Sequence, residues 1–202
     1  ALEYSDLWVS DQVIGKLPIL EVTTQLAYVA ALTSKIRIGT SVIVSNLRQS
    51  VQLAKSLSSL DNLSGGRLTV GLGLGTNTKM YPAFGLDPEH RVSRFIEGVG
   101  VMKALWTQSS VDFKGTFTQL EGIRMEPKPV QKPHPPLWFG ARVPDSMRRA
   151  VKHGDGWMGA GSGTNEDYLK EIGQLQRILA AEGRDPATFA VSKRIYFAID
   201  SD

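Results

Sequence analysis

The chain has 202 residues, of which 42% are hydrophobic and 21% charged, and its formal net charge is +3. These values are typical of a soluble protein with one sizeable core. The charges are scattered, whereas a nucleic-acid-binding surface needs clustered Lys and Arg, so we expect no nucleic-acid partner. The absence of cysteine excludes disulfides and thiolate metal sites. No apolar run approaches a membrane span and no secretory signal is visible, so we expect a cytoplasmic protein without membrane contact.

The first part of the chain alternates short apolar runs with longer amphipathic ones. Strands are predicted near 7–10, 36–44 and 67–74, and helices over 18–33, 49–63 and 88–107. The run 36–44 is β-branched and mostly apolar, as in a strand buried on both faces. Residues 111–126 alternate around two glycines and predict a hairpin or an extended excursion.

Five of the ten residues over 127–136 are proline, which excludes a helix or a central strand and predicts a stiff surface connector. After it, strands are predicted near 137–140, 156–160 and 189–199, with helices near 144–153 and over 166–182. A helix or a long crossover separates each main strand from the next. We therefore expect all of these strands to be parallel, with the helices outside the sheet.

Two architectures fit this alternation, an open doubly wound sheet and an eight-stranded barrel. We favour the α/β class and a TIM (β/α)8 barrel, as a single domain over residues 1–202. A whole barrel takes roughly 250 residues, and about six strands are visible here. We therefore expect the barrel to be incomplete at both ends of the sequence.

The most informative segment is 68–75, which contains most of the strand predicted at 67–74 and follows the glycine turn Gly65-Gly66. Glycines alternate with apolar residues along it, so one strand face is bare backbone. A bare face permits a flat group to approach closely, and the C-terminal strand ends of a barrel build its active site. The alternative is a tight packing contact without a ligand. The candidate cofactor contacts are Gly73, Gly75, Thr76 and Asn77. The alternative for Thr76 and Asn77 is that they only stabilise a turn.

Two glycine turns later in the chain each follow a strand and lead into a helix. Free backbone N–H groups at a helix start suit a phosphate, and Arg142 adds a bidentate donor. We expect the turns to converge on one anion site, with two flexible surface turns as the alternative. The candidate phosphate contacts are Gly140, Ala141, Arg142, Gly159, Ala160, Gly161 and Ser162. No pair among the three histidines has metal-ligand spacing, so no metal site is predicted.

Taken in order, several segments resemble the bacterial-luciferase-like superfamily, namely 26–33, 36–42, 60–75, 94–106, 127–136 and 154–157. That family consists of (β/α)8-barrel flavin or deazaflavin oxidoreductases. The chain is most similar to the single-component branch that uses coenzyme F420, a deazaflavin that passes hydride. The resemblance implies that Ser41 and Val42 lie behind the cofactor ring, joined by a non-proline cis peptide bond. The alternative is an ordinary trans strand end.

The tripeptide Ser10-Asp11-Gln12 stands where the family often carries Ser-Asp-His. The resemblance implies that Asp11 is a hydrogen-bond partner of the ring or ribityl chain, with a helix-cap or strand-end acid as the alternative. In some deazaflavin members the histidine is an acid or base, but a glutamine side chain does not titrate. Asp11 and Gln12 are the candidate catalytic residues.

The resemblance implies an F420-dependent oxidoreductase that moves hydride between the cofactor and a small organic substrate. The alternative is an FMN-dependent monooxygenase of the same fold that incorporates molecular oxygen. A third hypothesis is a non-catalytic barrel that binds a flavin or only stabilises a complex. We also predict a homodimer through helices 18–33 and 49–63. The outward faces of these helices are predicted to carry Ala27, Ala31, Leu47, Val51 and Leu57.

Overall fold

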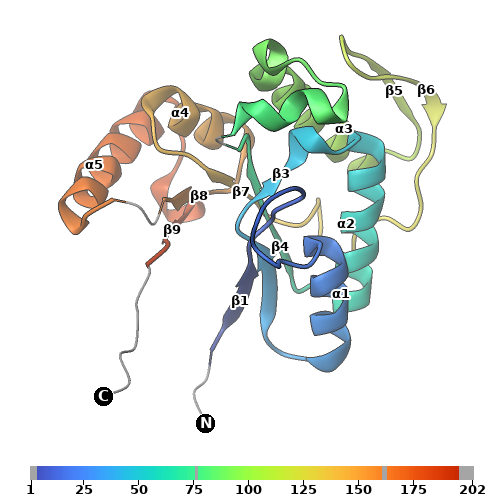
Figure 1. Cartoon of the computed structure of the whole chain (residues 1–202), viewed down its shortest axis with the longest axis horizontal. Helices are drawn as coiled ribbons and strands as arrows, with labels where there is room; N and C mark the ends of the chain where they lie inside the picture. Colours follow the sequence, from blue (N-terminus) through green and yellow to red (C-terminus); the bar gives the residue numbers. More distant parts are fainter. Residues whose placement is uncertain (1–3, 76, 161–162, 196–202) are drawn as a thin grey trace. The chain divides into compact units, whose positions relative to one another are not determined.

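The structure is a computed structural model that describes residues 4–75, 77–160 and 163–195 (Figure 1). The chain divides into two compact units, Ala1–Pro136 and Leu137–Asp202. The prediction of a single domain over residues 1–202 stays a prediction.

Parallel strands form the centre of the first unit. The strands β1 (Asp6–Val9), β2 (Arg37–Thr40) and β4 (Leu68–Gly73) are adjacent in that order, and β3 (Ile43–Val44) also pairs with β4. All of these pairs are parallel, as predicted. The run predicted as one strand over 36–44 is divided at the Ser41–Val42 peptide bond, which is the cis bond that the resemblance implied.

Three helices cover these strands, and three short 3-10 segments link them to the strands. The helices are α1 (Val22–Leu32), α2 (Ser50–Ser64) and α3 (Arg91–Thr107). The 3-10 segments are η1 (Ser45–Leu47), η2 (Thr78–Phe84) and η3 (Pro88–His90). The prediction that the first helix begins at residue 18 was wrong. It begins at Val22 because the carboxylate of Glu21 caps it and accepts the Thr24 N–H at 2.8 Å.

Helix α2 lies between α1 and α3 and therefore buries two sides (Figure 1). Leu53 and Leu57 are buried in this layer, and the indole N–H of Trp106 donates to the Ala54 carbonyl oxygen at 2.9 Å. Leu47 and Leu57 were predicted on outward faces for a dimer, and that placement was wrong. Both side chains are buried. Leu57 is buried because α2 is packed against a helix on each side, and Leu47 because it belongs to η1, which packs against α2 and α3.

The hairpin predicted over 111–126 consists of β5 (Val111–Lys114) and β6 (Gln119–Ile123), which are antiparallel. The carboxylate of Glu97 in α3 accepts the N–H groups of Thr116 and Phe117, at 2.7 and 2.9 Å, and so fixes the hairpin turn. Glu97 therefore joins the hairpin to the helix layer.

The proline-rich connector 127–136 is attached to α2 by side chains of that helix. Ser58 donates its hydroxyl to the Pro127 carbonyl oxygen at 2.5 Å. The buried carboxylate of Asp61 accepts the backbone N–H of Gln131 at 3.0 Å and its side-chain amide at 2.7 Å. The connector is thus held by specific hydrogen bonds rather than by regular secondary structure.

The second unit has three parallel strands in the order β7 (Leu137–Gly140), β8 (Gly156–Gly159) and β9 (Ala190–Lys193). Its helices are α4 (Pro144–His153) and α5 (Asn165–Ala181), with a 3-10 turn η4 (Pro186–Thr188). These elements confirm the predicted ones. Residues 196–199 of the last predicted strand lie outside the described residues. No helix in the described part of the chain is long and apolar enough to cross a bilayer.

Candidate cofactor site at the strand ends

Gly73, the last residue of β4, and Gly75, just after it, lie under two valine side chains from the segment that follows β2. A Cβ atom added to Gly73 would lie 2.5 Å from Val42 Cγ2, and one added to Gly75 would lie 3.0 Å from Val44 Cγ1. Gly75 also has a φ of +70°, which favours glycine. The close approach that the bare strand face predicted is therefore made by the protein's own valines. Contacts of Gly73 and Gly75 with a cofactor stay predictions.

Val42 and Val44 are themselves only half-buried, so they present an apolar surface at the C-terminal ends of the strands. Bulkier residues at positions 73 and 75 would displace Val42 and Val44. The two glycines therefore determine how closely the valine side chains approach the backbone below them. A rigid apolar surface of this kind suits one face of a flat ring system.

Asp11 forms the most enclosed ion pair of the first unit, and its partner is Arg48. The two guanidinium nitrogens of Arg48 lie 2.8 and 2.9 Å from the two Asp11 carboxylate oxygens. The Asp11 side chain is 1% exposed and that of Arg48 16%. One Asp11 oxygen also accepts the N–H of Val44 at 3.0 Å. In this geometry Asp11 positions Val44, whereas its predicted contact with the cofactor stays a prediction.

Glu21 extends the cluster to the first helix. Its carboxylate accepts a hydrogen bond from Arg48 at 3.2 Å and from the Thr23 hydroxyl at 2.7 Å, besides capping α1. Burial acts to raise the pKa of Glu21, but the hydrogen bonds from Thr24, Thr23 and Arg48 outweigh it and lower the pKa to about 2. Burial likewise acts to lower the pKa of Arg48, but Asp11 and Glu21 raise it overall.

The side chain of Gln12 packs against the loop that follows it. Its side-chain amide donates to the Leu17 carbonyl oxygen at 3.1 Å, and a Cβ atom on Gly15 would lie 2.2 Å from the Gln12 side chain. The side chain has no titrating group. The predicted catalytic role of Gln12 stays a prediction, and the contacts of the side chain are structural.

The next loop was predicted to contribute Thr76 and Asn77. Thr76 lies outside the described residues. The side chain of Asn77 accepts the Lys79 N–H at 3.1 Å and so caps η2, and the Tyr81 hydroxyl donates to the Leu74 carbonyl oxygen at 2.9 Å. These contacts are the turn chemistry that the sequence left as the alternative for Asn77.

In the second unit, the two glycine turns lie side by side. Gly140 pairs in register with Met158 in β8, and the Ala141 N–H faces the Met158 carbonyl oxygen at 3.4 Å. The segments that follow β7 and β8 therefore emerge at the same edge of this unit's sheet, as a shared anion site requires. The anion site itself stays a prediction, and Gly161 and Ser162 lie outside the described residues.

The donors predicted for a phosphate already have partners within the unit. The backbone N–H of Arg142 and that of Val143 both donate to the Ser146 hydroxyl at 3.1 Å. The Arg142 guanidinium lies 3.4 Å from the Glu171 carboxylate. A phosphate at this edge must therefore compete with Ser146 and Glu171.

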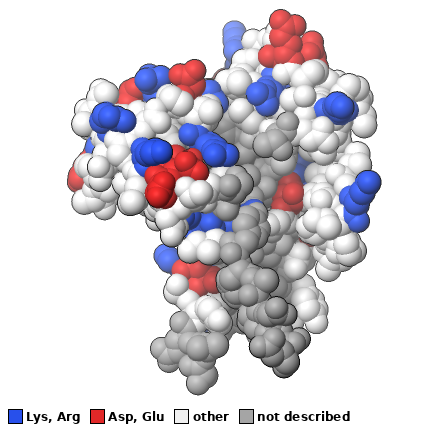
Figure 2. Space-filling model, turned by 60° about the vertical axis from the view of Figure 1, so that its left-hand side comes forward, with Lys and Arg blue, Asp and Glu red and all other residues white. Residues whose placement is uncertain are grey.

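Sequence reasoning missed Arg48, which links the strand ends to two carboxylates. Its partners Asp11 and Glu21 lie 37 and 27 residues earlier, so no local pattern revealed the pairing. The available signal was weak, an arginine a few residues after the predicted buried strand 36–44. Over the face drawn in Figure 2, basic and acidic side chains of the described residues are interspersed rather than gathered into one patch.

The family model for luciferase-like monooxygenases matches residues 1–202, so the chain belongs to that family. An uncharacterized protein of Mycobacterium tuberculosis is 35% identical over 167 residues, which are 82% of this chain and 58% of that protein. Pyrimidine monooxygenase RutA of Allorhizobium ampelinum is 30% identical over 84% of this chain and 48% of RutA. An F420-dependent glucose-6-phosphate dehydrogenase of Kineococcus radiotolerans is 29% identical over 97% of this chain and 60% of that enzyme.

Solved structures confirm the predicted α/β fold of the TIM-barrel type. Monooxygenase RslO1 from Streptomyces bottropensis superposes with a TM-score of 0.83 at 28% identity, over 96% of this chain and 61% of RslO1. An F420-dependent secondary alcohol dehydrogenase superposes with a TM-score of 0.82 at 23% identity, over 94% of this chain and 59% of that enzyme. The chain thus spans about three fifths of the length of these structures. The relatives include both F420-dependent dehydrogenases and monooxygenases.

Proposed function

We propose that this chain carries cofactor-binding strand ends of an F420-dependent oxidoreductase, which transfers hydride between the deazaflavin and a small organic substrate. The observation that carries the proposal is the half-buried apolar surface of Val42 and Val44, which lies against Gly73 and Gly75. The similarity to an F420-dependent dehydrogenase over 97% of the chain supports the choice of the deazaflavin.

In this proposal the valines lie against the cofactor ring and exclude water from one of its faces. Asp11 keeps Val44 in place through its N–H, and Arg48 holds Asp11. In the second unit, the turns Gly140–Ala141–Arg142 and Gly159–Ala160 bind a phosphate-bearing group. The cofactor, when bound, supplies the hydride chemistry, and the protein supplies position and electrostatics.

Gln12 restricts the direction of the reaction. Oxidising an alcohol requires a base that removes the hydroxyl proton, and a glutamine amide is not one. Reduction of an acceptor needs a proton instead, which water or the substrate itself supplies. We therefore expect a reductase that uses the reduced cofactor rather than an alcohol dehydrogenase.

The same residue favours a second candidate, an FMN-dependent monooxygenase that incorporates molecular oxygen. This reading does not require an acid or base at position 12, and the similarity to a pyrimidine monooxygenase over 84% of the chain supports it.

The homodimer also stays a proposal, through the face of α1 on which Tyr28, Ala31 and Leu32 are exposed.

The test is a fluorescence titration of the protein with F420 and with FMN under identical conditions. We expect F420 to bind at least about tenfold more tightly, which is about 1.4 kcal/mol. Val42→Asp places a charge on the apolar surface and should weaken F420 binding by about tenfold or more, because an unpaired carboxylate against an apolar ring is costly. Val191→Asp, at an exposed position of β9, is the matched control.

Tighter binding of FMN would move the protein to the monooxygenase reading. Absence of binding by either cofactor, in protein whose circular dichroism shows it to be folded, would contradict both. Should Val42→Asp fail to fold, Val42→Ala removes only part of the surface. An F420 affinity unchanged in Val42→Ala would remove this surface from the site.

A further inference from the structure

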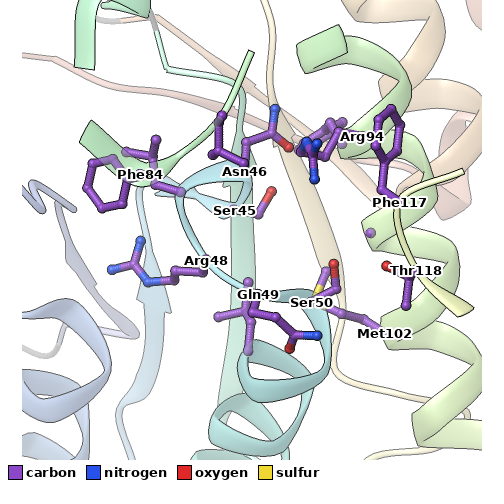
Figure 3. A pocket seen from close by; sticks show the side chains of 15 residues that line it. Ser45, Asn46, Arg48, Gln49, Ser50, Phe84, Arg94, Met102, Phe117 and Thr118 are labelled. Atoms are coloured by element: carbon purple, nitrogen blue, oxygen red, sulfur yellow. The ribbon is translucent and has the colours of Figure 1, made fainter. Parts of the chain in front are cut away.

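A pocket of about 230 Å³ lies in the first unit (Figure 3), and neither Val42 nor Val44 is among its lining residues. Its walls come from η1, the first turn of α2, the segment that follows η2, helix α3 and the β5–β6 turn. All of these elements belong to the same compact unit. The pocket is therefore a feature of one folded body.

Arginines supply all the charge in the lining of this pocket. They are Arg48 and Arg94, and no Asp or Glu is among the lining residues. Arg48 is neutralised by Asp11 and Glu21, and in Figure 3 its guanidinium extends away from Arg94. Arg94 therefore determines the charge of the pocket.

Arg94 lacks the partners that a part-buried guanidinium normally has. No ion pair among the described residues involves it. Over residues 4–75, 77–160 and 163–195, its Nε is the one buried side-chain nitrogen or oxygen without a hydrogen-bond partner. The guanidinium carbon lies 4.2 Å from the centre of the Phe117 ring, which positions the group but accepts no conventional hydrogen bond. Unsatisfied buried polar groups are rare in native proteins and require an explanation.

The rest of the lining is suited to a small organic molecule. Ser45, Ser50 and Thr118 contribute hydroxyl groups to the lining, and Phe84, Phe117 and Met102 contribute apolar surface (Figure 3). Ser50 stands at the first position of α2, where the positive end of the helix dipole favours an anion. The lining thus combines one unpaired cation, hydroxyl donors and an apolar wall.

We propose that this pocket binds a small organic carboxylate whose carboxylate pairs with Arg94 and whose apolar body lies against Phe84, Phe117 and Met102. The volume holds about eight water molecules at about 30 Å³ each, so the ligand is the size of a single substituted ring. Guanidinium groups bind carboxylates in a bidentate manner, with charge-assisted hydrogen bonds. The proposal does not rest on the redox function, because no residue of the Val42–Val44 surface lines the pocket.

The experiment is a calorimetric titration of the whole protein with benzoate, in the absence of any flavin. Benzamide has the same shape without the charge, and inorganic phosphate has the charge without the apolar body. Benzoate should bind saturably, and benzamide and phosphate should each bind at least about tenfold more weakly, which is about 1.4 kcal/mol.

Arg94→Met keeps the apolar stem and removes the charge, and we expect it to weaken benzoate binding by about tenfold or more. Arg124→Gln removes an exposed arginine of the same unit and is the matched control, with an expected change below about twofold. If Arg94→Met does not fold, Thr118→Val tests the same pocket by removing one hydroxyl and should weaken binding about threefold.

Three results would overturn the proposal: no saturable benzoate binding, equal binding of benzamide, or an unchanged affinity in the variants of Arg94 and Thr118. Equal binding of phosphate would overturn the assignment to an organic carboxylate. None of these outcomes depends on F420 or FMN, so failure here is distinct from failure of the proposed redox function.

Discussion

Asp11→Asn should destabilise the protein by about 3 kcal/mol, because it removes the negative partner of an enclosed ion pair. The carboxylate accepts two hydrogen bonds from Arg48, at 2.8 and 2.9 Å, and one from the Val44 N–H at 3.0 Å. Hydrogen bonds to charged groups contribute about 1.5–3 kcal/mol each, and breaking a buried pair costs about 3–5 kcal/mol. We expect the lower end of that range because Arg48 keeps Glu21 at 3.2 Å and is 16% exposed.

The measurement is the free energy of unfolding from urea denaturation at pH 7, followed by tryptophan fluorescence. Asp6→Asn is the matched control, because the Asp6–Arg37 pair has the same chemistry on the surface, with side chains 18% and 59% exposed. Exposed pairs contribute about 0–1 kcal/mol, so the control should change little. If Asp11→Asn costs no more than Asp6→Asn, the assignment of Asp11 as the anchor of the strand ends is wrong. A double-mutant cycle with Arg48→Met should give a coupling of about 2 kcal/mol or more.

Two further predictions concern Glu21 and Gly73 of the first unit, and the second of them takes its control from the second unit. The pKa of Glu21 is lowered from 4.5 to about 2 in the folded state, so its contribution to stability is present above about pH 4.5 and is lost as the pH falls towards 2. Because Glu21 is 45% exposed, Glu21→Gln should cost below about 1 kcal/mol at pH 7, with a smaller difference from wild type at pH 3; a constant difference in urea midpoints would contradict this. Gly73→Ala should cost about 1–3 kcal/mol, because its Cβ would meet Val42 at 2.5 Å, whereas Gly173→Ala in α5 meets nothing within 4 Å and should stabilise by about 0.5–1 kcal/mol. Equal melting temperatures of the two variants would show that Val42 is not fixed on β4.

The elements of the fold were predictable because each has a local signature. Apolar runs of the right length marked the strands, and the glycine pair after α2 marked its end, where Gly65 has a φ of +66°. The start of α1 was not predictable in the same way, because an acidic cap at Glu21 competes with a proline that is also suited to a first helical turn. The Glu21 carboxylate that caps the helix also pairs with Arg48, which lies far away in the sequence.

The candidate site was predictable only in part, because its contacts join distant segments. The alternating glycines of β4 predicted a close approach, but the approaching groups, Val42 and Val44, depend on how the chain turns after β2. The pairing of Asp11 with Arg48 and the unpaired state of Arg94 both depend on the tertiary structure. No periodicity or spacing in a single sequence distinguishes a paired arginine from an unpaired one.

The way the proline-rich connector is held has a practical consequence for dividing the protein. Its residues belong to the first unit, since Ser58 and Asp61 of α2 bind it and the Pro136 carbonyl oxygen accepts the Val70 N–H at 2.8 Å. A protein truncated before residue 127 would lose the groups that hydrogen-bond to the buried Asp61 carboxylate and to the Val70 N–H of β4. A boundary directly after Pro136 keeps these particular hydrogen bonds, between Asp61 and Gln131 and between Val70 and Pro136, within one piece.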